Sequence, residues 1–200
     1  MSERTEVSTT AGRPRNPGLD ASILTATRTL LAEVGYAKTT ISAISRASGV
    51  ATPAIYRRWS SKEAIVEEAV FGVEGATPPS GTGDLRADLL AWTHWFLGQI
   101  AEPAVRSAVP GLLASYQNTA GAYEKLVARS DHPIRHALIE VIADQFPAAP
   151  GKAAKVGDEV FDLLVASTVV RGLTRGEAGA GPFCDQLAET LALIVESRLS

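Results

Sequence analysis

The chain of 200 residues contains one cysteine, Cys184, so it can form no internal disulfide and offers no cysteine-rich metal site. An apolar segment that could act as a secretion signal is missing near the N-terminus, and no later apolar run reaches the length of a membrane span. Sustained alternation of polar and apolar residues, which is typical of half-buried strands, is missing too. These absences argue against secreted, membrane-inserted and sheet-containing proteins, and we expect a cytoplasmic all-α protein.

Residue patterns that support catalysis are also missing. The sequence has no Gly-rich phosphate loop, no Ser, His and Asp in the order of a catalytic triad, and no paired carboxylates. His132 and His136 have the i, i+4 spacing of two metal ligands on one helix, but Pro133 lies between them and no third ligand is indicated. We therefore expect neither enzymatic activity nor a metal or other cofactor.

The charges of the chain are unevenly distributed. A net charge of −3 would count against nucleic-acid binding if the charges were spread evenly. Residues 1–62, however, hold nine Lys and Arg against four Asp and Glu, whereas residues 63–200 hold ten against eighteen. This distribution predicts a basic N-terminal surface that meets phosphate groups and a larger acidic part that does not.

Four helices are expected in the N-terminal part. Residues 1–17 are rich in Ser, Thr, Gly and Pro, and we expect them to form a disordered basic arm. From Asp20 onward, apolar residues recur on one helical face as far as Gly35, which stands where a C-terminal cap belongs. Two short helices then flank Gly49, and residues 60–63 have the Ser-x-x-Glu spacing of a capping box ahead of a fourth helix.

The segment from Thr40 to Ile65 is the most informative part of the chain. Thr40 suits the N-cap of a helix that ends at Ser48, and Gly49 can adopt the left-handed conformation that ends a helix. A second helix after Val50 completes a helix-turn-helix, whose second helix can enter the major groove of DNA. This arrangement, together with the basic charge of the same region, predicts DNA binding.

The second of these helices carries side chains suited to reading a groove. Thr52, Pro53 and Ala54 are small and allow the backbone to approach the bases. We expect Thr52 to be the N-cap and Pro53 the first helical residue. About one turn later, Tyr56 and Arg57 can reach phosphate oxygens or base edges.

Two further basic residues follow. Lys62 begins the next helix, where the helix dipole and the free backbone N–H groups favour an anion such as phosphate. Arg58 is expected to point back along the backbone. Isolated charges of this kind usually form a solvated surface, but their position around one helix-turn-helix favours a role in DNA binding.

Beyond a stretch rich in Gly, Pro and Ser at residues 75–83, the chain reads as a series of helical patterns. The expected segments are residues 84–101, shorter pieces cut by Pro103 and Pro110, residues 122–146 with a kink or break at Pro133, and finally residues 158–174 and 185–198. The pattern predicts an all-α fold with nine or ten helices.

Residues 19–70 resemble the DNA-binding domain of the tetracycline-repressor (TetR) family of bacterial regulators. The family pattern has a threonine, spaced apolar and small residues, Gly-Val, an apolar residue with Tyr, an aromatic residue and Lys-Glu. These features fall on Thr40, Ile41, Ile44, Ser45, Gly49, Val50, Ile55, Tyr56, Trp59, Lys62 and Glu63. The motif covers about a quarter of the chain, and the remainder is similar to the family only in its all-helical architecture and length.

Two positions depart from the family pattern. Ala51 stands where the family usually has a serine before the recognition helix, which removes a phosphate contact, and Ser48 precedes the glycine. Neither change disturbs the turn. Carried over by position, Thr40, Tyr56 and Lys62 would hold phosphates, while Thr52, Pro53, Ala54 and Arg57 would face bases.

The resemblance also implies a domain organisation. It consists of the basic arm at residues 1–17, a helix-turn-helix DNA-binding domain of three to four helices at residues 18–74, a linker at residues 75–83, and a helical ligand-binding and dimerisation domain at residues 84–200. Such a protein is a homodimer that binds a palindromic operator as a repressor and is released by a small, apolar effector. The last two helices would form the dimer interface, although their apolar residues could equally form intramolecular core.

Two weaker signals concern the arm and the effector site. Arg13 and Arg15 resemble residues that enter a narrow minor groove, but four residues are weak evidence and a flexible tail is the favoured interpretation. An effector pocket could be lined by apolar and polar residues of the C-terminal part. The candidates are Trp92, Trp95, Phe96, Gln99, Tyr116 and Tyr123, and core packing explains their aromatic members as well.

Three other functions remain open at this point. An activator of the same fold has the same sequence features, because activation depends on where the operator lies. A sequence-tolerant architectural DNA-binding protein is favoured by the basic arm and opposed by the acidic C-terminal part. A helical enzyme or small-molecule carrier could retain a vestigial helix-turn-helix.

Overall fold

The computed structural model describes residues 17–72, 77–117, 121 and 132–200. Over these residues the chain forms α-helices and no β-strand, which confirms the predicted all-α class. The helices are α1 (Pro17–Val34), α2 (Ile41–Ser48), α3 (Thr52–Tyr56), α4 (Lys62–Phe71), α5 (Leu85–Ala101), α6 (Pro103–Tyr116), α8 (His132–Gln145), α9 (Pro150–Arg175) and α10 (Gly181–Leu199). Within this described part, no helix combines the length and apolar character needed to cross a lipid bilayer.

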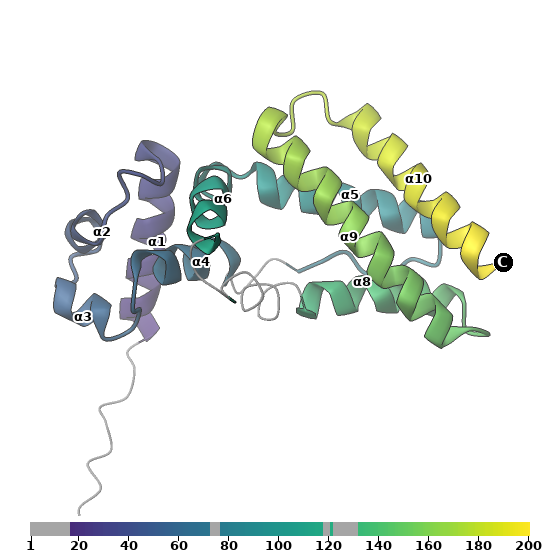
Figure 1. The fold of residues 1–200 in the computed structure, drawn as a ribbon, viewed down its shortest axis with the longest axis horizontal. Helices are drawn as coiled ribbons and strands as arrows, with labels where there is room; N and C mark the ends of the chain where they lie inside the picture. The colour runs from purple at the N-terminus through teal and green to yellow at the C-terminus, as the bar shows by residue number, and fades with distance from the viewer. Residues whose placement is uncertain (1–16, 73–76, 118–120, 122–131) are drawn as a thin grey trace, which may run out of the picture.

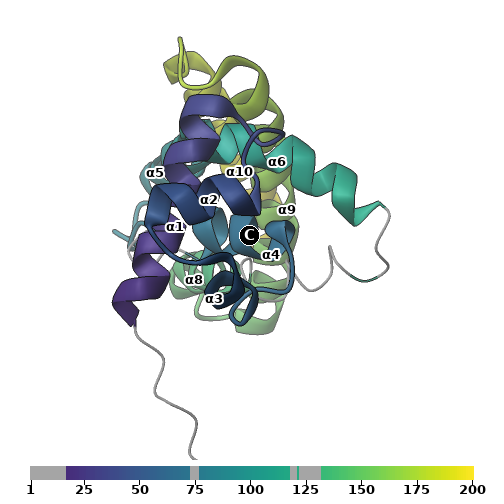
Figure 2. The same cartoon turned by 90° about the vertical axis from the view of Figure 1, so that its left-hand side faces the viewer.

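The helices form two groups that meet at α6. Helices α1 to α4 lie at one end of the molecule, α5, α8, α9 and α10 pack together at the other, and α6 lies between them (Figure 1). Seen from the N-terminal end, α2 and α3 face the viewer and no described helix covers them (Figure 2). The N-terminal helices are therefore anchored on one side and open on the other.

A small apolar core holds the N-terminal helices together. Its buried members come from α1, α2, α3 and α4 and the turns between them: Ile23, Ile44, Val50, Ile55, Trp59 and Ile65. The Trp59 indole N–H also donates to Glu68 Oε2 at 2.7 Å, which ties the end of the helix-turn-helix to α4. Helices as short as α2 and α3 are unstable alone, so this shared core is what stabilises them.

Helix α2 is capped by the two residues that the sequence predicts, Thr40 and Gly49. The Thr40 hydroxyl accepts the backbone N–H of Ala43 at 3.1 Å, and Gly49 ends the helix with φ of +70°. The Ser48 hydroxyl closes the same turn by donating to the carbonyl of Ile44 at 2.7 Å. These contacts fix the direction in which the chain leaves α2 and enters α3.

A second apolar cluster spans the two groups of helices. Leu31 of α1 and Val66 and Val70 of α4 pack against α6 residues that include Ala104 and Ala108. Next to this cluster, Arg28 donates to the carbonyl of Ala69 at 2.7 Å and pairs with Glu102 at 3.2 Å. The small side chains on α6 allow the helices to approach closely, so the first and sixth helices share one buried interface.

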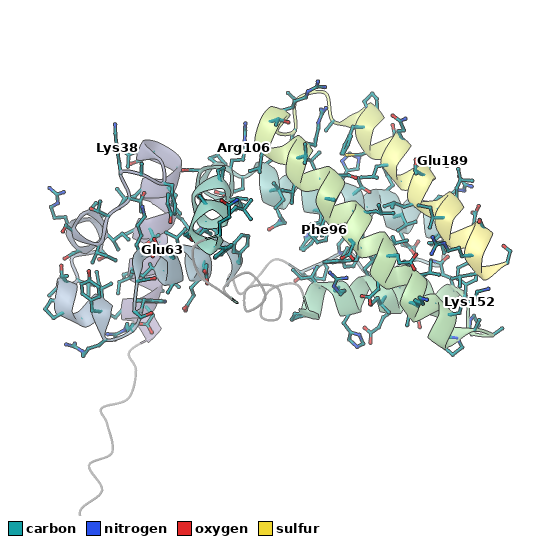
Figure 3. The ribbon with its side chains drawn as sticks, viewed as in Figure 1. Lys38, Glu63, Phe96, Arg106, Lys152 and Glu189 are labelled. Carbon is teal, nitrogen blue, oxygen red and sulfur yellow. The ribbon has the colours of Figure 1, made fainter. Side chains whose placement is uncertain are left out.

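The third cluster forms the core of the C-terminal helices. Trp92 and Phe96 of α5 pack with Phe161 of α9 and with apolar residues of α8 and α10. Phe96 lies inside this group of helices (Figure 3). At one crossing, a Cβ on Gly172 would lie 2.6 Å from Ile100 Cγ2, so glycine is what allows α9 to approach α5 there.

One carboxylate is buried at the edge of this core. Asp88 of α5 is 1% exposed, and it accepts hydrogen bonds from the backbone N–H and hydroxyl of Thr82 and from the side-chain amide of Gln145. A buried carboxylate is tolerated when its oxygens are hydrogen-bonded in this way. Asp88 thereby joins the segment before α5 to the end of α8.

Several predicted boundaries were wrong. Pro110 does not divide the chain, because it lies on the exposed side of α6 while Val109 and Leu112 keep the helix packed. Pro133 lies in the first turn of α8, where a missing N–H leaves no helical bond unmade. The residues immediately before His132 lie outside the described part of the chain, so the kink or break expected at Pro133 stays a prediction. Residues 122–131 of the segment predicted for residues 122–146 lie outside the described residues.

Two helix starts also differ from the prediction. Ser61, not Ser60, is the N-cap of α4, since its hydroxyl accepts the N–H of Ala64 at 3.2 Å. Glu63 is therefore the second residue of the helix and not the third, as the expected capping box requires. Helix α9 begins at Pro150, earlier than the predicted residue 158, because Ala153 and Val156 already face the core.

The left-handed cap gives a testable prediction. Gly49→Ala should lower the free energy of unfolding by about 1–2 kcal/mol, because an alanine is strained at positive φ. The matched control is Gly151→Ala in α9. A Cβ meets nothing within 4 Å at either glycine, and only Gly49 has positive φ, so the control should leave stability unchanged or slightly higher. Urea unfolding measures both, and equal effects would contradict this account.

Candidate nucleic-acid interface

Helix α3 begins with backbone hydrogen bonds rather than a side-chain cap. Its N-cap is Ala51, whose carbonyl accepts the N–H groups of Ala54 at 2.8 Å and Ile55 at 3.3 Å. The expectation that Thr52 caps this helix was therefore wrong by one residue. Thr52 is the first helical residue and Pro53 the second, where the missing proline N–H leaves no bond unmade.

The small residues at this helix start differ in exposure. Pro53 is exposed, whereas Thr52 and Ala54 are half-buried. Ala54 packs on the N-terminal apolar core, so it also has a structural task. Because the side chains at the start of α3 are small, the backbone there can come close to the bases in a DNA groove.

The two arginines that follow α3 have different surroundings. Arg58 is folded back on the protein: Nη1 donates to the carbonyl of Ala54 at 3.1 Å and Nε pairs with Asp20 of α1. Arg57 is exposed and, within the described part of the chain, its side chain has no hydrogen-bond or ion-pair partner. Tyr56 beside it is 55% exposed. Tyr56 and Arg57 are therefore free to meet a ligand, and Arg58 is not.

Lys62 stands at the N-terminus of α4 and is held by Tyr36. Its ammonium donates to the carbonyl of Tyr36 at 2.6 Å and lies 3.7 Å from the centre of the Tyr36 ring. Partial burial lowers the pKa of Lys62, and the neighbouring Glu63 carboxylate opposes that effect. The lysine is thus half-buried and fixed in place rather than extended into solvent.

Tyr36 is a residue that the sequence patterns did not single out. It lies in the turn between α1 and α2, next to Gly35, and its phenol donates to Glu63 Oε1 at 3.3 Å. An aromatic residue between a helix cap and the next N-cap could have signalled a packed turn. Its contact with Lys62, however, joins residues far apart in sequence, which no local pattern shows.

The remaining DNA-contact candidates lie on different parts of the surface. Thr40 is exposed, and its hydroxyl oxygen accepts the N–H of Ala43 while its own hydrogen stays available. Arg13 and Arg15 lie outside the described residues.

The effector candidates are only partly brought together. Trp92, Trp95 and Phe96 contact one another through their rings, with centroids 5.1 to 6.3 Å apart. Tyr116 belongs instead to the cluster that joins α6 to the N-terminal helices, and Gln99 is exposed. Tyr123 lies outside the described residues.

Neither cavities nor acidic clusters point to another chemistry in the described part of the chain. A groove of about 540 Å³ lies between α1 and α2, away from the aromatic residues of α5, and small side chains line it. Over the residues described, no group of three or more His, Cys, Asp or Glu side chains could hold a metal ion. The open face with α3, Tyr56 and Arg57 is thus the best-defined site.

Comparisons with known proteins agree with this arrangement. Residues 23–69 match the model for bacterial regulatory proteins of the tetR family, and residues 79–191 match the model for the tetracyclin repressor-like C-terminal domain. An uncharacterised HTH-type transcriptional regulator of Mycobacterium bovis is 29% identical over 170 residues, which is 82% of either chain. A similarly described regulator of Mycobacterium tuberculosis matches to the same extent.

Solved structures share the fold. A protein of Pseudomonas aeruginosa that has been assigned as a transcriptional regulator aligns with a TM-score of 0.61 at 20% identity, covering 93% of this chain and 96% of that one. A TetR variant of Acinetobacter baumannii in complex with minocycline aligns with a TM-score of 0.54 at 18% identity, covering 92% and 96%. At such identities the likeness supports a common fold.

The neighbouring arginines provide a matched pair of substitutions. Arg57→Ala should weaken DNA binding and change the melting temperature little, because exposed side chains usually contribute within about 0.5 kcal/mol to stability. Arg58→Ala should lower the free energy of unfolding by about 1–3 kcal/mol, because it leaves Asp20 and the carbonyl of Ala54 without their partner. Thermal unfolding and fluorescence anisotropy with labelled duplex DNA test both. The reverse pattern would contradict the assignment.

Proposed function

The chain belongs to the tetR family of bacterial regulatory proteins, and on this basis we propose that it is a cytoplasmic transcriptional repressor whose homodimer binds a palindromic operator and is released by a small-molecule effector. The observation that carries the proposal is the uncovered face of α3 (Figure 2). On this face Tyr56 and Arg57 are exposed beside a helix start of small residues. A surface of this shape fits the major groove, with Tyr56 on a phosphate and Arg57 on base edges.

Dimerisation follows from the size of the DNA site. One helix as short as α3 contacts only a few base pairs, and two-fold symmetry doubles the sequence that is read. The candidate interface is the outer side of α9 and α10. Both helices pack on α5, so the sides that they turn away from α5 form an outer surface (Figure 1).

This outer side of α9 and α10 has few charges and several exposed apolar residues. Leu163 and Val170 of α9 are 45% and 66% exposed, and Leu193 of α10 is 52% exposed. Residues 163–170 and 190–195 contain no charged side chain. Exposed apolar surface without charges is the composition expected of the centre of a homodimer interface.

Charged residues beside this surface are paired within the protomer. Arg86 of α5 pairs with Glu189 and Glu196 of α10, and Arg198 pairs with Glu159 of α9. Glu189 lies on the outer edge of α10 (Figure 3). Because these ion pairs are exposed, they add little to stability, but they give the apolar surface a polar rim.

The effector site is proposed within the C-terminal helices. Trp92 is fully buried, and within the described part of the chain its indole N–H has no hydrogen-bond acceptor. A buried donor without an acceptor is uncommon, and a polar group of a bound molecule would satisfy it. The surrounding Trp95 and Phe96 favour an effector with a large apolar part.

Dimerisation can be tested with a matched pair of glutamate substitutions. Val170→Glu should convert the dimer to a monomer and weaken operator binding by at least about tenfold, because it buries a charge at the interface centre. Leu113→Glu is the control, since Leu113 is exposed to a similar degree, at 41%, but lies on α6. Size-exclusion chromatography with light scattering gives the masses. If both variants remained dimers, the interface would lie elsewhere.

Operator recognition can be tested by selecting duplexes from a random DNA pool with the wild-type protein. We expect an enriched palindrome whose half-sites lie about one helical turn, or a multiple of it, apart. The same selection with Arg57→Ala should relax the sequence at specific positions, whereas Tyr56→Ala should weaken binding to all duplexes. Placing the selected site over a reporter promoter should reduce transcription. Equal affinity for random and selected DNA would contradict the proposal, and increased transcription would indicate an activator.

A further inference from the structure

The ring of Tyr36 is seated against α6. A Cβ on Gly111 would lie 2.6 Å from Tyr36 Cγ and closer still to two other ring carbons, so no larger residue fits without moving the ring. Gly111 belongs to α6, which packs on α1 and α4. Tyr36 is therefore a residue of the N-terminal helices whose position depends directly on α6.

Lys62 is attached to this same tyrosine in two ways. The ammonium lies 3.7 Å from the centre of the ring and donates to the Tyr36 carbonyl at 2.6 Å. An ammonium group has three N–H bonds, and the carbonyl takes one of them. The others can bind an anion at the N-terminus of α4, where the helix dipole also favours negative charge.

The phenol of Tyr36 holds the next residue of α4. Its O–H donates to Glu63 Oε1 at 3.3 Å. Burial, with a further contribution from Glu63, raises the pKa of Tyr36 to about 12, so the phenol keeps its proton at neutral pH. One tyrosine thus binds the first two residues of α4 and contacts α6 at the same time.

We infer that Tyr36 is a positioning residue for DNA binding: seated at Gly111, it holds the Lys62 ammonium where a backbone phosphate of the operator binds. The inference rests on the proposed function, because it assigns a task within operator binding. A lysine fixed at two points has already lost much of its rotamer freedom, so phosphate binding costs less. Displacement of α6 against α1 would move the ring and thereby the ammonium.

If Tyr36 had only a structural role, the salt dependence of DNA binding would differ from that expected for a positioning residue. Overpacking at Gly111 would then lower stability but leave the number of phosphate contacts unchanged. That number is measurable, because the logarithm of affinity falls with the logarithm of salt concentration by about 0.9 per phosphate neutralised. The salt slope therefore separates loss of a phosphate contact from loss of folded protein.

The experiment measures binding to a duplex carrying the palindrome selected by the wild-type protein, by fluorescence anisotropy over a range of KCl concentrations at which all variants are folded. Gly111→Ala displaces the ring, and we expect affinity to fall about tenfold and the salt slope to fall by about 0.9 per subunit. In a Lys62→Ala background, which already lacks the contact, Gly111→Ala should have no further effect on either value.

Two variants control for packing and for chemistry. Gly172→Ala overpacks α9 against Ile100 at a comparable distance but far from Lys62, so it should lower stability and keep the wild-type salt slope. Tyr36→Phe keeps the ring and the carbonyl, and it should bind DNA as the wild type does. Tyr36→Leu removes the aromatic face without overpacking α6, and it should reproduce the loss even if Gly111→Ala folds poorly.

The outcomes separate the two proposals. If the wild-type protein enriches no duplex, the proposed function itself fails. If it binds a selected duplex, but Gly111→Ala and Tyr36→Leu keep the wild-type salt slope, the positioning role of Tyr36 is overturned and DNA binding stands. Additive effects of Gly111→Ala and Lys62→Ala would overturn it as well, because the two changes would then act independently.

Discussion

The packing of α6 against α1 and α4 is the contact on which the rest of the architecture depends. Ala104 and Ala108 of α6 allow the helices to approach closely, and Leu31, Val66 and Val70 are buried in the apolar cluster that α6 completes. Without this contact, the N-terminal and C-terminal helices would each keep a core and lose their mutual orientation. The position of α3 relative to the outer side of α9 and α10 is therefore determined by α6.

The charged side chains of the N-terminal helices differ from those of the C-terminal helices. Most acidic side chains around α9 and α10 are used in ion pairs within the protomer, such as those of Arg86 and Arg198. On the N-terminal helices, by contrast, Arg57 and Tyr56 remain exposed. A chain with net negative charge can thus present a locally basic surface, because its acidic groups lie mainly on the other helices.

The sequence predicted the features that depend on neighbouring residues. The cap at Thr40 and the left-handed turn at Gly49 are both determined by short-range patterns. Predictions failed where contacts between residues far apart in sequence determine the structure. One example is α6, which tertiary packing keeps helical through Pro110. The partners of Lys62 and Arg58 come from the α1–α2 turn and from α1, so local spacing showed neither pair.

The order of the three apolar clusters along the chain has a consequence for folding during synthesis. The buried members of the helix-turn-helix core all lie between Ile23 and Ile65, so this core is complete once Ile65 has been made. The apolar face of Leu31, Val66 and Val70 can be covered only after α6 has been made. Helix α5 can pack on α10 only about a hundred residues later. During synthesis, the apolar face of Leu31, Val66 and Val70 therefore lacks its cover until α6 has been made.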